Sequence, residues 1–132
     1  MYFYRAMPFT FPKKEKLKSK KLIEQLFVAG KSVSQYPIKL IYLKTELPSD
    51  VAIQAGVTVP KKNFKSAVKR NHIKRLLRES YRLNKALVFN NSEGSFAFLF
   101  LYLGKETLPF DAVQHKMKLL LRKFNDHIKK NQ

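Results

Sequence analysis

The sequence predicts a single α+β domain in which one β-sheet carries helices. Two observations indicate this class. A chain of 132 residues, 45% of them hydrophobic, can bury roughly two thirds of its unfolded surface in one core. Stretches with strand periodicity alternate with stretches of helix periodicity, and one part of the chain reads as strand, helix, strand. Such a unit predicts two neighbouring parallel strands in one sheet.

The domain is expected to begin after an irregular start of the chain. Residues 1–10 are aromatic and unpatterned, and we predict an extended arm there, with the single domain over residues 11–130. Ser19 is suited to begin a short helix and Gly30 to end it. The expected buried stripe of this helix consists of Leu22, Ile23, Leu26 and Phe27.

Strands are expected next. Residues 36–43 predict a strand with Ile38, Leu40 and Tyr42 on one side, although two strands over residues 32–43 are an alternative. A turn is expected at residues 47–50. Residues 51–59 alternate, which predicts a strand with one buried face that consists of Val51, Ile53, Ala55, Val57 and Val59.

The second half of the chain predicts a further strand and a closing helix. After a loop at residues 90–94, residues 96–103 are apolar at every position. Such a run suits a central strand covered on both faces, or one that is covered on one face and binds a ligand with the other. From Phe110 onward, helix periodicity predicts the buried stripe Val113, Met117, Leu120, Leu121, Phe124 and Ile128.

Between these strands lies the most unusual segment, Pro60 to Lys85, which contains ten Lys or Arg residues and one carboxylate, Glu79. On a helical wheel at about 100° per residue, apolar residues fall on one arc and basic residues on the other. Like charges spaced by four residues repel by a few tenths of a kcal/mol per pair. We therefore favour a bound polyanion over a merely solvated face. The polar arc contains Arg70, Asn71, Lys74, Arg75, Arg78, Arg82 and Lys85.

The overall charge points to the same partner. The formal net charge is +18, with 27 Lys and Arg against 9 Asp and Glu, and nucleic acid is the commonest partner of such a domain. An anionic membrane is the alternative, but the face opposite the charges lacks the Trp or Phe residues of an interfacial helix. The chain has no cysteine, which fits a reducing compartment, and we expect the cytoplasm.

The sequence offers no catalytic apparatus. The nine acidic residues are scattered singly, without a pair at i,i+3 or i,i+4 on any expected helix. His115 and His127 are interpreted as isolated surface residues of the last helix. Phosphate-binding glycine loops and HExxH patterns are absent. We therefore expect no catalytic residue, no metal site and no bound cofactor in this chain.

Aromatic residues on the expected strands provide a second possible contact with nucleic acid. Tyr36, Tyr42 and the aromatics of residues 96–103 lie beside the basic segment in the sequence. Stacking of single-stranded bases on such rings contributes roughly 1–3 kcal/mol per base. A place in the core is the alternative for most of these rings, so the basic residues carry the stronger argument.

The basic segment also carries a family resemblance. AVKRNHIKRLLRES resembles the motif of bacterial ribonuclease P protein subunits, in which Arg-Asn-Arg is followed by Ile-Lys-Arg-Leu-hydrophobic-Arg. Further stretches resemble other parts of the family sequence. The strand that precedes this motif is similar to GVTVPKK, and the first helix is similar to KLKSKKLIEQLFVAGKSV. The last connection and helix are similar to YLGKETLPF and HKMKLLLRKF. The resemblance covers residues 11–128.

The resemblance implies a fold, an activity and partners. The fold would be an αβββαβα sandwich with a four-stranded sheet, similar to the second domain of ribosomal protein S5. The chain would be the protein subunit of an endoribonuclease that removes the 5′ leader from precursor tRNA. The catalytic RNA would contain the active centre and require Mg²⁺. The implied partners are this RNA and the single-stranded leader, without a membrane or a protein partner; a ribosomal or assembly-type RNA-binding protein is the alternative.

Site residues follow from the match. Phe27 corresponds to an aromatic that faces the cleft for the leader, and Tyr36 and Tyr42 are further candidates for that cleft. His72 replaces the second Arg of the motif, so a phosphate contact there is expected to be weaker or dependent on pH. Ile23 and Ile41 stand where aromatics are expected, and the segment between Lys62 and Ala67 is one residue longer than the pattern. The RNA-binding residues are expected to be Lys61, Lys62, Lys69, Arg70, Asn71, His72, Lys74, Arg75, Arg78 and Arg82.

Overall fold

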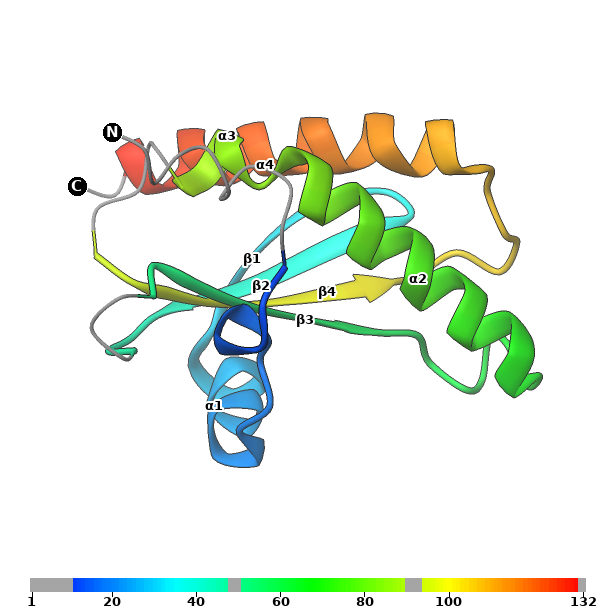
Figure 1. Ribbon diagram of the computed structural model, residues 1–132, viewed down its shortest axis with the longest axis horizontal. Helices are drawn as coiled ribbons and strands as arrows, with labels where there is room; N and C mark the ends of the chain where they lie inside the picture. Colours follow the sequence, from blue (N-terminus) through cyan, green and yellow to red (C-terminus); the bar gives the residue numbers. More distant parts are fainter. Residues whose placement is uncertain (1–10, 48–50, 90–93, 131–132) are drawn as a thin grey trace.

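The computed structural model describes residues 11–47, 51–89 and 94–130. Within them lies a sheet of four strands in the order β1-β2-β4-β3 (Figure 1). The predicted arm over residues 1–10, the turn residues 48–50 and the loop residues 90–93 lie outside the described ranges. The strands are β1 (Lys31–Gln35), β2 (Ile38–Lys44), β3 (Ile53–Thr58) and β4 (Phe96–Tyr102).

The strand pairing confirms the predicted parallel unit and favours the two-strand alternative for residues 32–43 over a single strand at residues 36–43, because Tyr36 and Pro37 form the turn. β3 and β4 are parallel neighbours, as the strand-helix-strand unit predicts. The region 32–43 forms an antiparallel hairpin of two strands, in which Lys31 pairs with Tyr42 and Gln35 with Ile38. β2 pairs with β4 in the antiparallel sense, so β4 is central and has a neighbour on each side.

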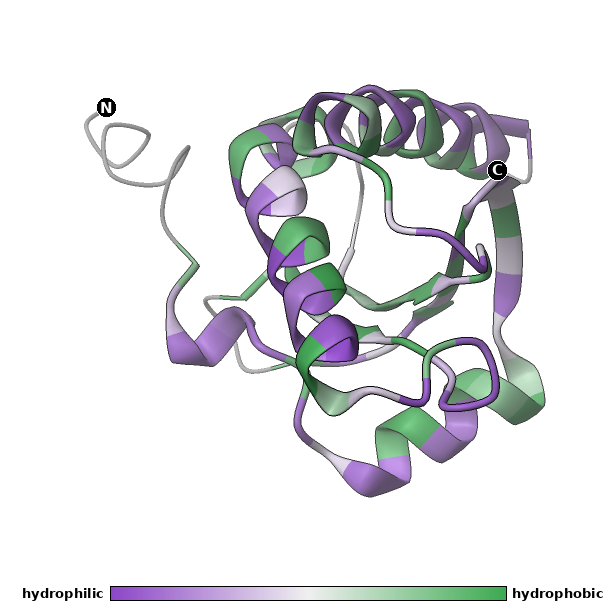
Figure 2. Ribbon diagram, turned by 90° about the vertical axis from the view of Figure 1, so that its right-hand side faces the viewer, coloured by the Kyte–Doolittle hydropathy of each residue, from purple (hydrophilic) through white to green (hydrophobic). Residues whose placement is uncertain are grey.

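Helices cover both faces of this sheet. Figure 1 shows α1 below the sheet and α2 and α4 above it, and the side view in Figure 2 has the same layers. The order along the chain is therefore αβββαβα, as the family resemblance implies, with one turn of 3₁₀ helix (Lys13–Glu15) and the short α3 added. The helices are α1 (Lys20–Ala29), α2 (Ala67–Asn84), α3 (Ala86–Phe89) and α4 (Phe110–Lys130).

The uniformly apolar β4 is covered on both faces. Successive side chains of a strand point to opposite sides, and alternate residues of β4 belong to two separate apolar clusters. Phe96, Phe98, Phe100 and Tyr102 lie in the larger cluster beneath α2 and α4. Ala97 and Leu99 are buried in the smaller cluster, which lies between the sheet and α1, and Leu101 packs against this cluster. The prediction of a doubly covered central strand is confirmed, and its aromatic rings are core residues.

The two terminal helices differ in how well their periodicity predicts burial. All six residues of the predicted α4 stripe are buried. In α1 the residues Ser19 and Gly30 flank the helix as predicted, with the Ser19 hydroxyl accepting a hydrogen bond from the Leu22 N–H at 3.2 Å. However, Leu26 is the one buried residue of α1, and Phe27 is 57% exposed. The prediction of a buried Phe27 is wrong, because α1 meets the sheet along a narrower line than the apolar arc suggests.

Candidate nucleic-acid interface

The basic segment divides into a loop and a helix. Residues 60–66 form a turn and a connection, and α2 begins after Ser66, whose hydroxyl accepts a hydrogen bond from the Lys69 N–H at 3.3 Å. The loop is held to the end of the sheet because Phe64 is buried and its ring lies 6.1 Å from that of Tyr102. Lys61 and Lys62 on this loop are exposed.

Arg70 connects the helix with this loop. Its Nη1 donates hydrogen bonds to the carbonyl oxygens of Phe64 at 2.8 Å and Lys65 at 3.0 Å. A guanidinium has five N–H donors, so Arg70 retains donors for a further acceptor while it orders the loop. Its role is therefore partly structural, which the motif alone does not reveal.

The first three turns of α2 present the predicted basic face to solvent. Ile73 and Leu77 are buried against the sheet, which turns the opposite side of the helix outward. Lys74 is half-buried. Because one side of α2 is apolar and the other is polar, hydrophilic and hydrophobic residues alternate along this helix in Figure 2. The exposed members are Lys69, Asn71, His72, Arg75 and Arg78, and we call them together with Arg70 and Lys74 the basic face.

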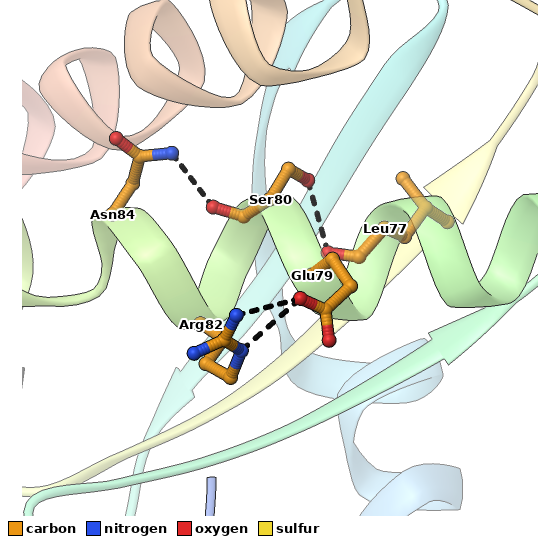
Figure 3. Close-up of polar contacts among 5 residues, drawn as sticks. All are labelled: Leu77, Glu79, Ser80, Arg82 and Asn84. Carbon is orange, nitrogen blue, oxygen red and sulfur yellow. Dashed lines mark hydrogen bonds and ion pairs between the residues drawn. The ribbon is translucent and has the colours of Figure 1, made fainter. Parts of the chain in front are cut away.

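The last turns of α2 are less available for a polyanion. Arg82 donates from Nη2 at 2.7 Å and from Nε at 3.2 Å to the same carboxylate oxygen of Glu79 (Figure 3). On the inner side, the Ser80 hydroxyl donates to the Leu77 carbonyl, and the Asn84 amide donates to the Ser80 carbonyl. Arg82 is thus half-buried and partly neutralised by its own helix.

The prediction that Lys85 lies on the basic outer surface is wrong. Lys85 is fully buried, and its Nζ lies 2.7 Å from a carboxylate oxygen of Glu15. The helical wheel fails here because α2 ends at Asn84 and the 3₁₀ turn from the start of the domain packs over this end. The basic face therefore extends from Lys69 to Arg78.

A groove joins the basic face to the other side of the sheet. It has a volume of about 220 Å³. Its apolar surface comes largely from the sheet, and the cationic side chains Lys16, Lys18 and Arg78 lie along it. Arg78 thus belongs to both the basic face and the groove. The lining also includes Phe11, Leu17, Ile23, Ala55, Gly56, Val57 and Leu99.

The contribution of Lys16 and Lys18 to this groove was not predicted. The segment around them runs beside β3, where the Leu17 N–H donates to the Ala55 carbonyl at 3.0 Å and Lys16 forms a parallel bridge with Ala55. The alternation Lys16-Leu17-Lys18 is the sequence feature that indicates an extended segment, with Leu17 buried and both lysines turned outward.

The three predicted cleft aromatics do not meet at one place. Phe27 is exposed on α1, close to the end of β1 that pairs with Tyr42. Tyr36, which is 67% exposed, lies at the other end of the hairpin, and the length of β1 between these ends is roughly 13 Å at about 3.3 Å per strand residue. They therefore cannot line a single short cleft.

Tyr42 is a core residue and not a stacking surface. It is 4% exposed, its ring centroid lies 4.9 Å from that of Phe124, and its hydroxyl is hydrogen-bonded to His127 Nδ1 at 2.9 Å. Burial raises the pKa of the Tyr42 hydroxyl above its ordinary value. The prediction of Tyr42 in the cleft is wrong, and so is the interpretation of His127 as an isolated surface residue.

Among the described residues, no three His, Cys, Asp or Glu side chains gather closely enough to hold a metal ion. No helix within residues 11–47, 51–89 and 94–130 is long and apolar enough to cross a bilayer.

Comparisons with known proteins agree on one family. The family model described as Ribonuclease P matches residues 11–125. The chain is 35% identical over 118 residues to the ribonuclease P protein component of Porphyromonas gingivalis, with 86% of each chain covered. It is 33% identical over 126 residues to the corresponding protein of Chlorobaculum tepidum, with 83% of this chain and 82% of that protein covered.

Solved structures give the same answer. The ribonuclease P protein of Thermotoga maritima superimposes with a TM-score of 0.66 at 25% identity, over 82% of this chain and 96% of that chain. The Staphylococcus aureus protein has the same TM-score at 18% identity, over 82% and 93% of the two chains, which supports the fold alone. Because a family model covers most of the sequence and the αβββαβα fold accompanies it, this chain belongs to the ribonuclease P protein family.

Proposed function

We propose that this chain is the protein subunit that binds the catalytic RNA of ribonuclease P and assists it in removing the 5′ leader from precursor tRNA. The observation that carries the proposal is the basic face on α2. Its apolar side is anchored by Ile73 and Leu77, so its cationic side chains stand out together from a rigid element. Lysine and arginine contacts to phosphate, with release of counterions, supply most of the affinity in such complexes.

The proposal assigns the chemistry to the RNA. The nine acidic residues of the sequence are scattered singly, whereas phosphodiester hydrolysis by a protein commonly uses clustered carboxylates that hold metal ions. In this proposal Mg²⁺ is required by the RNA, and the protein lowers the repulsion between its phosphates and those of the substrate. The complex would work in the cytoplasm.

The groove is the proposed place of the leader. A single strand needs cations along its backbone and apolar surface for its bases, and the groove has Lys16, Lys18 and Arg78 beside an apolar wall. Phe27 lies one turn after Ile23, which lines the groove, so it is placed to extend the contact. Tyr36 and Tyr42 are not part of this proposed leader site.

Cleavage at low magnesium concentration tests the proposal. Purified protein is added to catalytic RNA and precursor tRNA, and release of the leader is measured across a magnesium titration. We expect the protein to shift the titration to lower magnesium and to release no leader without the RNA. Absence of rescue, or cleavage by the protein alone, would contradict the proposal. Sequencing of co-purifying RNA separates this function from binding of ribosomal RNA.

A further inference from the structure

A second hollow lies at the end of the sheet where the β1–β2 turn meets the connection from β4 to α4. Its volume is about 370 Å³. None of its lining residues belongs to the basic face or to the groove. It is lined by Tyr36, Pro37, Tyr102, Gly104, Lys105, Glu106, Leu108 and Lys116.

The walls of this hollow are held by specific contacts. The Leu103 N–H donates to the Pro37 carbonyl at 2.7 Å, which joins the end of β4 to the hairpin turn. The Tyr102 hydroxyl donates to the Glu106 carbonyl at 2.6 Å, and burial raises the pKa of this hydroxyl. Binding sites for small ligands are usually preformed in this way.

Gly104 fits closely between two of these walls. A Cβ atom at this position would lie 3.0 Å from Pro37 Cβ and 3.0 Å from Tyr102 Cε2. A larger residue would push the turn and the ring apart, so the glycine permits the close approach of the two walls.

The side chains around the hollow match the chemistry of one nucleotide. Tyr36 is 67% exposed although it lines the hollow together with the apolar Pro37 and Leu108. An exposed aromatic ring beside cations is the usual arrangement for stacking an unpaired base. Lys105 and Lys116 supply two cations for its phosphate, whereas Glu106 is the one acidic residue in the lining.

The hollow is also connected to the basic loop. The Asn63 amide donates to the Leu103 carbonyl at 3.4 Å, and Phe64 packs on Tyr102. The loop that carries Lys61 and Lys62 therefore adjoins the wall of the hollow, so that an RNA backbone held by this loop would pass near it.

We propose that this hollow binds a single unstacked nucleotide of RNA, with the base on the ring of Tyr36 and the phosphate facing Lys105 and Lys116. The inference rests on the proposed function for the presence of RNA at this end of the molecule. Its chemistry is that of any unpaired nucleotide, whether it comes from the catalytic RNA or from precursor tRNA.

Substitution of Tyr36 tests the site in the reconstituted complex. Two dissociation constants are measured, that of the protein from catalytic RNA and that of precursor tRNA from the complex. Tyr36→Ala is expected to raise one of these two dissociation constants by roughly 5- to 150-fold, the equivalent of one stacked base. Tyr36→Phe keeps the ring, so it is expected to bind both RNAs as tightly as the wild type. The constant that changes identifies the RNA that supplies the nucleotide. Unchanged values for both RNAs with Tyr36→Ala would overturn the proposal.

The charge contribution is tested on α4. Lys116→Ala is expected to reduce the slope of log K against log salt concentration by about 0.7 for a single-stranded contact. Lys118→Ala is the matched control, because Lys118 is exposed on the same helix and does not line the hollow. An equal effect of the two variants would contradict a phosphate contact at Lys116.

A photoreactive phenylalanine analogue at position 36 locates the nucleotide directly. Crosslinking to an unpaired nucleotide supports the proposal, and crosslinking to paired nucleotides alone overturns it. The low-magnesium cleavage assay with the wild-type protein is read separately. If the wild-type protein restores cleavage and Tyr36→Ala leaves both dissociation constants unchanged, the nucleotide site alone is rejected. If the protein does not restore cleavage but Tyr36→Ala weakens RNA binding, the proposed function alone is rejected.

Discussion

The Nζ of Lys85 lies 2.7 Å from a carboxylate oxygen of Glu15, and the two residues are 0% and 8% exposed. This ion pair joins the start of the domain to the end of α2, across 70 residues of sequence. The same N-terminal stretch supplies Lys16 and Lys18 to the groove. The pair therefore helps to position the groove wall.

Removal of one partner from this pair is expected to destabilise the fold. Lys85→Met leaves the Glu15 carboxylate buried without its cation, which costs about 3–5 kcal/mol in comparable buried pairs. The free energy of unfolding is measured by urea denaturation. Lys118→Met, an exposed change on α4, is the control and is expected to have little effect. The double variant Glu15→Leu with Lys85→Met should recover most of the loss; a loss below about 1 kcal/mol in Lys85→Met would contradict this role.

Stability is expected to fall at alkaline pH because of Tyr81. Burial, and secondarily the Glu15 carboxylate, raises the pKa of Tyr81 well above its ordinary value of 10.0. Below pH 10 the hydroxyl is protonated in both states, and its contribution to stability is complete. As the pH rises above 10 the unfolded chain loses this proton first, so the free energy of unfolding falls by up to about 1.4 kcal/mol per pH unit.

The variant Tyr81→Phe isolates this contribution. Its loss of stability between pH 9 and pH 11 is expected to be smaller than that of the wild type by about 1 kcal/mol or more. Thermal and urea unfolding at both pH values measure the difference. Tyr36→Phe is the control, because Tyr36 is exposed and Tyr81 is fully buried. The same pH dependence in Tyr81→Phe and in the wild type would show that Tyr81 is not responsible.

Two arginines of α2 are expected to differ in their contribution to RNA binding. Arg75 is exposed, whereas Arg82 is half-buried and bonded to Glu79. Arg75→Ala is therefore expected to weaken binding of catalytic RNA and to reduce the salt slope by about one unit, and Arg82→Ala to have a smaller effect on both. Filter binding at several salt concentrations measures both quantities. A larger effect of Arg82→Ala would mean that its pair with Glu79 opens on binding.

The groove is expected to discriminate between precursor and mature tRNA. Phe27→Ala and Lys18→Ala remove side chains that lie on or beside the proposed path of the leader, so each should weaken binding of precursor tRNA and leave mature tRNA nearly unaffected. Removal of one stacked base corresponds to roughly 1–3 kcal/mol. Competition binding to the reconstituted complex compares the two substrates. An equal loss for both would place these side chains outside the leader path.

Sequence periodicity predicted those features that depend on neighbouring residues along the chain. The stripe of α4 is buried at all six predicted positions. Four of the five residues predicted on the buried face of residues 51–59 are buried and Val57 is partly buried, and β3 and β4 are parallel as predicted. A helix or strand turns its apolar side to the core, so the pattern determines the buried face where the core covers that whole side, as it does for α4 but not for α1.

The tertiary structure decided those features that depend on which segments meet. Lys85 resembles its basic neighbours in the sequence. However, Glu15 packs over the end of α2 and forms a buried ion pair with Lys85. Tyr36 and Tyr42 are both strand-region tyrosines, yet one is exposed at a turn and the other lies under α4. Charge pairing and burial result from contacts between distant parts of the chain, and local periodicity contains no information about those partners.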